Sequence, residues 1–313
     1  MTILQSVILA IIEGLTEFLP VSSTGHMILA DSLLKIQDAE FAKTFEIVIQ
    51  LGAILAVFAL YIKRFFVSLD IYIKLAVAFL PTGIIGFLAY KIIKEKLMNP
   101  YVVSSSLVIG GILLIILDKW SGRKRSAYAG TESMSIAGAF KIGLIQCLSM
   151  IPGVSRSAAT ILGGVSQGFD RKQAAEFSFL LAIPTMFAAS GYELFKNHGS
   201  IHKDNLMVLG LGGAIAFLVA IFAVKGFIAF LSKYGFKHFG YYRIGLGILF
   251  LIYALSTGLK LQDEKPKTLR LPKGGSTPDQ QTLPLDFIRR CQQAQNQYPQ
   301  KAEGDFSQSH GKA

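Results

Sequence analysis

The sequence predicts an all-α polytopic membrane protein, because long apolar runs recur along most of the chain while charged residues are sparse. Of its 313 residues, 52% are hydrophobic and 16% are charged. A helix needs about 20 mostly apolar residues to cross a hydrocarbon core of about 30 Å. We expect six membrane-spanning helices, at residues 41–62, 71–93, 101–118, 173–194, 205–231 and 239–259.

Two further apolar segments are interrupted by polar residues and proline. The first covers about residues 3–34 and is broken by FLPVSSTGH, and the second covers about residues 136–169 and is broken by MIPGVSRSAAT. Proline removes an amide donor and disfavours helix at the preceding residue. The apolar arms on either side are too short for a comfortable crossing, so the sequence predicts a broken helix in each segment.

The two interrupted segments resemble one another, which indicates an internal duplication. A shift of 133 residues aligns identical residues that include Val21/Val154, Ser22/Ser155, Ile28/Ile161 and Leu29/Leu162. A shift of 132 continues into the next helix with Asp38/Asp170, Ala42/Ala174 and Phe45/Phe177. We predict repeat halves at about 1–120 and 135–260. Irregular backbone at membrane depth is tolerated only around a protein-lined or wet cavity, so both breaks should face one cavity.

The formal net charge of +11 does not indicate nucleic-acid binding. The basic residues lie mainly in short connections between apolar runs, where contact with the membrane surface explains them. Because most connections carry such residues, their distribution does not fix the orientation of the chain. The composition becomes polar after about residue 260, so we predict a membrane domain at 1–260 and a disordered tail at 261–313.

Glu13 and Glu17 lie four apart just before the first break, so on a helix they share one face. Two carboxylates so placed repel unless a divalent cation, a shared proton or a cationic partner intervenes. The alternative is that both reach interfacial water. A charged side chain at the membrane centre costs about 2.5–3.5 kcal/mol even on the scale from membrane-insertion experiments, which gives the lowest costs. This cost favours a functional arrangement of the two carboxylates over the alternative.

The first break places hydroxyls, free amides and an imidazole at one point, because Pro20 ends the helix before VSSTGH. Ser22, Ser23 and Thr24 supply the hydroxyls. Taken alone, Ser22 and Ser23 are typical helix caps. His26 alone is typical of a satisfied core or interface histidine. Beside the glutamate pair, an active site is favoured, in which His26 protonates a leaving oxygen or accepts a proton from a serine.

The second break places Arg156 between Ser155 and Ser157, with Gly153 before it and Thr160 one helical turn beyond it. An arginine between apolar arms needs an anionic partner. Its planar fork, together with hydroxyls and amides at a helix N-terminus, suits a phosphate or a carboxylate. The alternative is a structural ion pair with one of the glutamates of the first break, and the two roles are compatible.

Two polar residues of a spanning helix extend the predicted site. Glu46 and Gln50 lie four apart in FEIVIQLGAILAV and are expected to border the cavity around the breaks. Glu176 lies at the start of a later span, where an acidic residue complements the helix dipole.

These motifs resemble those of a known family, the bacterial undecaprenyl-diphosphate phosphatases of the bacitracin-resistance type. The resemblance rests on EGLTEFLPVSSTGH, FEIVIQLGAILAV, PGVSRSAAT and EFSFLLAIP, in that order within residues 1–260. It implies six spanning helices plus two pairs of re-entrant helices in an inverted repeat. The tail after about residue 260 has no expected counterpart in the family.

The resemblance also implies the activity. The family removes the terminal phosphate of undecaprenyl diphosphate, which recycles the lipid carrier of peptidoglycan assembly and gives bacitracin resistance. It implies a divalent cation, Mg²⁺ or Ca²⁺, and a multi-pass protein of the bacterial cytoplasmic (inner) membrane whose active site opens to the outer face. We also expect bacitracin to compete for the lipid substrate, and a homodimer is a further expectation. The residues by themselves indicate only an anion-binding, carboxylate-rich cavity facing lipid.

Together these observations give a mechanistic hypothesis with four catalytic residues, Glu17, Ser23, His26 and Arg156. Arg156 holds the phosphoryl oxygens, Ser23 attacks or orients a water, and Glu17 and His26 transfer protons. Glu13 and Glu17 hold the metal. Further phosphate contacts are expected from Ser22, Thr24, Gly153, Ser155, Ser157 and Thr160.

A proton-coupled transporter of an anionic polyprenyl phosphate lipid is the alternative. Duplicated halves, broken helices and intramembrane glutamate, histidine and arginine also suit a carrier. The serines distinguish the two classes, because transport does not require a nucleophile beside a histidine.

Overall fold

The computed structural model describes residues 1–36, 39–66, 69–121, 126–196 and 205–258. The predicted tail at 261–313 and Asp38 of the duplication lie outside these residues. The described helices are Ile3–Thr16 (α1), Ser23–Leu34 (α2), Ala39–Tyr61 (α3), Leu69–Ile92 (α4), Pro100–Ser121 (α5), Ile136–Gln146 (α6), Arg156–Ser166 (α7), Arg171–Lys196 (α8), Leu206–Tyr234 (α9) and Lys237–Thr257 (α10). Short helical turns occur at Ile62–Phe66, Ile93–Leu97, Thr131–Ser133 and Cys147–Met150.

Six of the described helices, α3, α4, α5, α8, α9 and α10, are long and apolar enough to cross a membrane, which confirms the predicted spans. Their outer faces carry exposed apolar side chains such as Phe87, Phe222 and Leu249. Such faces suit contact with lipid, where an apolar surface is not exposed to water. The chain is therefore a multi-pass membrane protein.

The two predicted broken helices are present as α1 followed by α2, and α6 followed by α7. At 1.5 Å per residue, the 14 residues of α1 and the 12 of α2 extend about 21 and 18 Å. The 11 residues each of α6 and α7 extend about 16 Å. All four lengths are below the roughly 30 Å of a hydrocarbon core, so no arm crosses alone. A re-entrant course for each pair is consistent with these lengths and stays a prediction.

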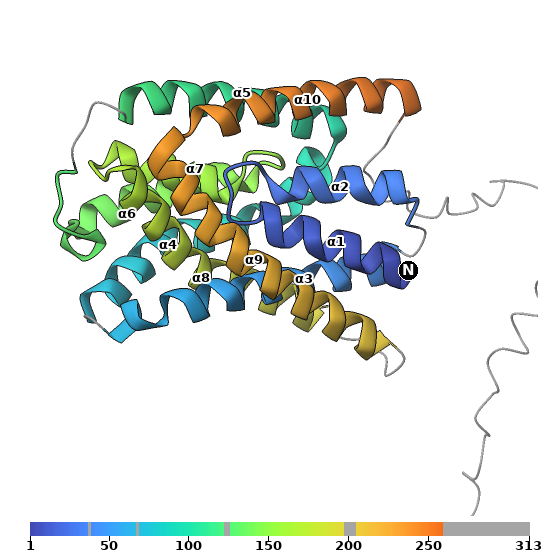
Figure 1. The fold of residues 1–313 in the computed structure, drawn as a ribbon, viewed down its shortest axis with the longest axis horizontal. Helices are drawn as coiled ribbons and strands as arrows, with labels where there is room; N and C mark the ends of the chain where they lie inside the picture. Colours follow the sequence, from blue (N-terminus) through green and yellow to red (C-terminus); the bar gives the residue numbers. More distant parts are fainter. Residues whose placement is uncertain (37–38, 67–68, 122–125, 197–204, 259–313) are drawn as a thin grey trace, which may run out of the picture. The chain divides into compact units, whose positions relative to one another are not determined.

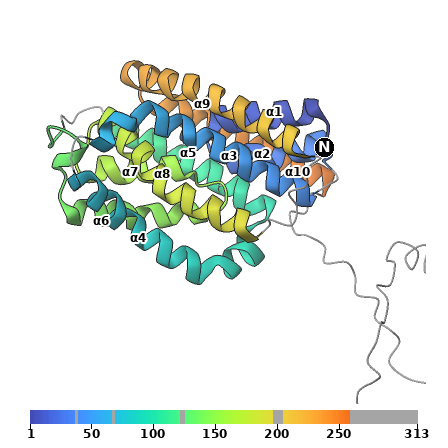
Figure 2. The ribbon, with the colours of Figure 1, turned by 90° about the horizontal axis from the view of Figure 1, so that it is seen from below.

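The two halves interlock instead of forming separate domains. The broken helix α1 packs against α9 of the second half, and its duplicate α6 packs against α4 of the first half. The duplicates α5 and α10 lie side by side along one edge in Figure 1, and α3 also contacts its duplicate α8. Figure 2 shows the same elements after a quarter turn. Three spans follow each broken pair, and this odd number agrees with the predicted inverted repeat.

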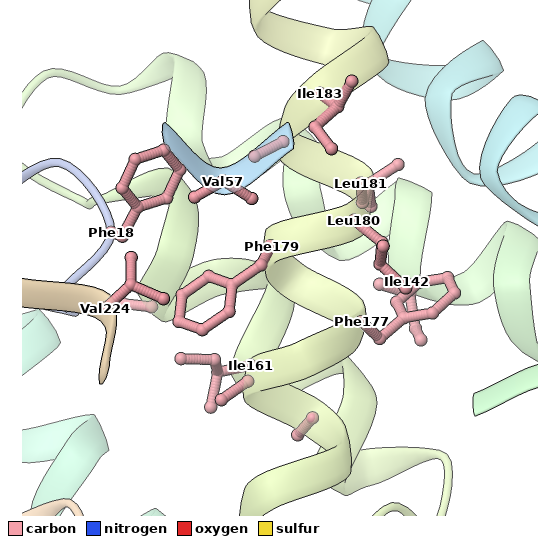
Figure 3. Packing of buried hydrophobic residues seen from close by; sticks show 14 of the residues in the cluster. Phe18, Val57, Ile142, Ile161, Phe177, Phe179, Leu180, Leu181, Ile183 and Val224 are labelled. Carbon is pink, nitrogen blue, oxygen red and sulfur yellow. The ribbon is translucent and has the colours of Figure 1, made fainter. Parts of the chain in front are cut away.

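The largest apolar cluster surrounds α8 and reaches the first break (Figure 3). Phe177, Phe179 and Leu181 of α8 meet side chains from α3, α6, α7 and α9. Phe18, which follows directly on Glu17, packs its ring edge-on against Phe179, with centroids 5.9 Å apart. Burial of this aromatic side chain holds the irregular backbone of the first break in a fixed place.

Helices α3 and α9 approach closely at a pair of glycines. A Cβ atom on Gly52 would lie 2.3 Å from the carbonyl oxygen of Gly213, so no side chain fits there without moving backbone.

We therefore predict that Gly52→Ala lowers the free energy of unfolding by about 1–3 kcal/mol, the usual cost of forcing extra atoms into packed structure. Gly210→Ala on α9 is the matched control, because a Cβ there meets nothing within 4 Å. Thermal unfolding in detergent measures both variants. Equal melting temperatures for Gly52→Ala and wild type would contradict this account of the contact.

Candidate active site

The two breaks share one backbone geometry. Ser22 and Ser155 both have positive φ, 71° and 75°, a conformation that is uncommon for residues other than glycine. Each caps the following helix, since Ser22 Oγ accepts from Gly25 N at 3.4 Å and Ser155 Oγ from Ala158 N at 3.2 Å. All of these positions are related by the same shift of 133 residues. The two breaks therefore share one local backbone conformation, as the predicted duplication requires.

Arg156 joins the second break to the first through an ion pair with Glu17. Its Nη2 lies 3.1 Å from Glu17 Oε1, and both side chains are largely buried. Arg156 Nη1 also donates to the carbonyl of Ser178 at 3.0 Å, and the guanidinium lies over the Phe18 ring at 5.5 Å. Its buried Nε–H has no hydrogen-bond partner among the described residues. Arg156 thus binds an acid of the first break, while its Nε–H remains without an acceptor among the described residues.

Ser23 and not Ser22 faces the acid. The Ser23 hydroxyl donates to Glu17 Oε2 at 2.5 Å, whereas the Ser22 hydroxyl is used as a helix cap. One oxygen of Glu17 therefore accepts from the first half of the chain and the other from the second half. The sequence alone does not choose between the adjacent serines, because both fit a cap.

Glu13 and Glu17 do not reach interfacial water, since they are only 4% and 7% exposed. Their carboxyl groups contact one another, as the spacing of four predicts. Glu46 of α3 interacts with Glu13 and with Asp31 of α2, so acidic side chains of three helices lie near one another. Glu17 therefore lies at one end of a row of carboxyl groups, of which Glu13 and Glu17 are buried and Glu46 and Asp31 are partly exposed.

Gln50, the other predicted residue of α3, has a different partner. Ser190 Oγ of α8 donates to Gln50 Oε1 at 2.7 Å. Glu176 pairs with Arg64 at 3.2 Å, and Arg64 is 44% exposed. These two contacts hold α8 beside its neighbours and do not include the Glu17–Arg156 pair.

The residues around Glu17 suit a cation only in part. Within the part of the chain that the structure describes, no group of three histidine, cysteine or acidic side chains is arranged to hold a metal ion. The adjacent carboxyl groups of Glu13 and Glu17 supply oxygen ligands. Mg²⁺ is commonly bound by one or two carboxylates together with substrate phosphate and water. The site thus fits a cation that is bound jointly by the two carboxylates and by the phosphate of a ligand.

His26 is held by two contacts, neither of which involves Ser23. Its Nδ1 lies 2.8 Å from the carbonyl oxygen of Ser22, and its Nε2 lies 2.7 Å from the hydroxyl of Tyr242. The ring also stacks on Tyr242, with planes only 8° apart. A carbonyl oxygen can only accept, so Nδ1 carries the proton and neutral Nε2 accepts from Tyr242. Tyr242 is not among the residues that the sequence predicts for the site, because it lies in an otherwise ordinary span.

The remaining hydroxyls of the second break bond to backbone or to each other. Ser157 Oγ donates to the carbonyl of Phe18 at 2.8 Å, a second link between the breaks. Thr160 Oγ1 donates to the carbonyl of Arg156 and lies 2.6 Å from Ser178 Oγ. Thr24 is exposed. Direct phosphate contacts by these residues stay predictions, and the described contacts show Ser157 and Thr160 fastening the break.

These features define a duplicated, multi-pass membrane protein with a polar centre where its two broken helices meet. The chain belongs to the family described as bacitracin resistance protein BacA, whose model matches residues 6–249. It is 53% identical over 253 residues to a Wolinella succinogenes protein named undecaprenyl-diphosphatase, covering 81% of this chain and 98% of the relative. Proteins of the same name from Flavobacterium johnsoniae and Persephonella marina are 51% and 50% identical over 255 residues, covering 80% and 82% of this chain and 96% and 100% of the relatives.

We predict that Tyr242→Phe alters the environment of His26 Nε2, because it removes a hydrogen bond worth about 0.5–1.5 kcal/mol. Nitrogen NMR of histidine-labelled protein measures this, with His26→Gln to assign the signal. Tyr241→Phe is the control, since Tyr241 is the preceding residue and 59% exposed. An unchanged Nε2 signal in Tyr242→Phe would contradict the contact.

Proposed function

We propose that this protein hydrolyses undecaprenyl diphosphate to undecaprenyl phosphate and inorganic phosphate. One observation carries the proposal: Glu17 accepts from the Ser23 hydroxyl on one oxygen and from the Arg156 guanidinium on the other. A hydroxyl (Ser23), a base (Glu17) and a cation (Arg156) are thus directly hydrogen-bonded to one another through Glu17. The family and the names of the relatives support the substrate.

Arg156 binds the terminal phosphoryl group in this proposal. Its unpartnered Nε–H supports the role, because a buried donor without a partner is costly unless a ligand supplies an acceptor. Guanidinium matches phosphate geometry and is always charged. Phosphoryl transfer spreads negative charge over the equatorial oxygens, where a fixed cation stabilises the transition state.

Ser23 is the proposed nucleophile and Glu17 its base. Glu17 takes the hydroxyl proton while Ser23 Oγ bonds to the terminal phosphorus, and the bond from that phosphorus to the bridging oxygen breaks. Undecaprenyl phosphate leaves, and His26, when it carries a proton on Nε2 as well as on Nδ1, protonates the leaving oxygen and becomes neutral. A water then attacks the phosphoserine, and neutral His26 takes its proton. The bond from phosphorus to Ser23 Oγ breaks, Glu17 returns the hydroxyl proton to Ser23, and inorganic phosphate leaves. In the second version, Ser23 and Glu17 orient a water that attacks directly.

Glu13 and Glu17 would hold a divalent cation, Mg²⁺ or Ca²⁺, which when bound supplies neutralisation of diphosphate charge. Removing it with EDTA should reduce phosphate release at least about tenfold, and added Mg²⁺ or Ca²⁺ should restore it. Phosphate release by detergent-solubilised protein measures both steps. Full activity in excess EDTA would rule out this part of the proposal.

We further propose a location in the bacterial cytoplasmic (inner) membrane, with the site opening to the outer face. There the product re-enters the carrier cycle of peptidoglycan assembly. Bacitracin would compete for the lipid diphosphate, which fits the description of the family. A homodimer is proposed as the assembly.

The central test compares phosphate release by wild type, Glu17→Gln and Arg156→Ala. Each variant should lose at least about a thousandfold, because a catalytic base and a phosphoryl-binding arginine each contribute on this scale. Glu176→Gln is the control, since its partner Arg64 lies at the surface. If wild type and both variants all release phosphate at similar rates, the proposed active site is wrong. If well-folded wild type releases no phosphate, the transporter is favoured instead.

Ser23→Ala separates the two versions of the chemistry. If Ser23 is the nucleophile, this variant should release no measurable phosphate, whereas Ser22→Ala should lose stability because its hydroxyl caps α2. Rapid acid quench of wild type with labelled substrate should then trap phosphoserine. Near-normal turnover by Ser23→Ala would exclude the covalent version.

A further inference from the structure

Arg243 of α10 is a second buried arginine, and it lies outside the sequence motifs of the two breaks. Its side chain is 0% exposed and is the largest fully buried one in the described part of the chain. It takes part in none of the ion pairs that the described residues form. A buried charge without a counter-charge persists only where its hydrogen bonds are satisfied.

Each of the five N–H donors of Arg243 has its own carbonyl acceptor. Nε donates to Leu107 at 3.4 Å. Nη1 donates to Pro20 at 3.1 Å and to Val154 at 2.9 Å. Nη2 donates to Ser106 at 3.1 Å and to Gly153 at 2.8 Å. A guanidinium has five donors, so none is left for a substrate.

Three of these carbonyls belong to the two breaks. Pro20 lies two residues before the capping Ser22, and Gly153 lies two residues before the capping Ser155. The same side chain therefore holds both backbones directly before they turn into the helices that carry Ser23 and Arg156. Ser106 and Leu107 of α5 anchor the guanidinium from the other side.

The neighbouring helix leaves room for this arginine. A Cβ atom on Gly110 of α5 would lie 2.2 Å from Arg243 Nη2. Any side chain at Gly110 would push the guanidinium away from its carbonyls, so the tight fit requires glycine there.

We propose that Arg243 is a positioning residue that fixes the two breaks relative to one another, and so sets the distance between Ser23 and Arg156. The inference rests on the proposed active site. Arg156 and Arg243 differ in one decisive respect: Arg156 keeps a buried donor unpartnered, whereas all donors of Arg243 are used by backbone. Arg156 is thus suited to bind phosphate, and Arg243 acts through the backbone of both breaks.

Arg243→Lys tests the proposal, because lysine keeps the charge but has three donors and no planar fork. We expect kcat per folded molecule to fall at least about a hundredfold, the scale of a misplacement near 1 Å, while KM changes less than about threefold. Arg171→Lys is the control. Arg171 binds Asp118 and Ser121 at the end of α5 and contacts neither break. The kcat per folded molecule of Arg171→Lys should therefore stay near that of wild type.

Gly110→Ala is a second variant that retains Arg243, and it decides the question if Arg243→Lys does not fold. It should lower kcat in the same way, whereas Gly245→Ala on α10 should not, since a Cβ there meets nothing within 4 Å. Unchanged kcat in folded Arg243→Lys or Gly110→Ala, or a raised KM with unchanged kcat, would overturn the proposal. Failure of wild type to release phosphate would instead reject the proposed function.

Discussion

The buried ion pair between Glu17 and Arg156 is the interaction on which the site depends. Removing one member of such a pair leaves an uncompensated charge, at a cost of about 3–5 kcal/mol, so each residue requires the other. The pair also links two segments 139 residues apart in sequence. Because Glu17 binds Ser23 through its second oxygen, the same contact fixes the orientation of the one break hydroxyl that donates to an acid within the described part of the chain. The Glu17–Arg156 pair therefore both links the two breaks and places the groups proposed for phosphate chemistry.

The duplication repeats the backbone geometry of the break, but the two copies carry different side chains. Both breaks place a capping serine at positive φ before a short helix. The aligned side chains differ: Ser23 corresponds to Arg156, and Glu13 corresponds to Gln146. Gln146 is fully buried and donates to Thr82 Oγ1 at 2.7 Å, so the second half carries a neutral amide where the first carries an acid. The halves thus contribute complementary groups to one asymmetric site.

The sequence predicts the spans, the breaks and the duplication because these depend on local hydropathy, on proline and on self-similarity. It also predicts Glu17 and Arg156, since charges inside apolar runs need partners. It cannot choose between Glu13 and Glu17 as the partner of Arg156, nor between Ser22 and Ser23, because these choices depend on side-chain directions set by packing. Arg243 and Tyr242 lie in a span with apolar neighbours, and only the fold brings them to breaks more than 80 residues away.

The most direct test of the central claim is an experimental structure of the protein with a methylene-bridged, non-hydrolysable analogue of undecaprenyl diphosphate. The claim is that both breaks together hold the terminal phosphoryl group. It predicts the terminal phosphonate within hydrogen-bonding distance of Arg156, with Ser23 Oγ facing its phosphorus. A well-ordered phosphonate that contacts neither residue would contradict the claim.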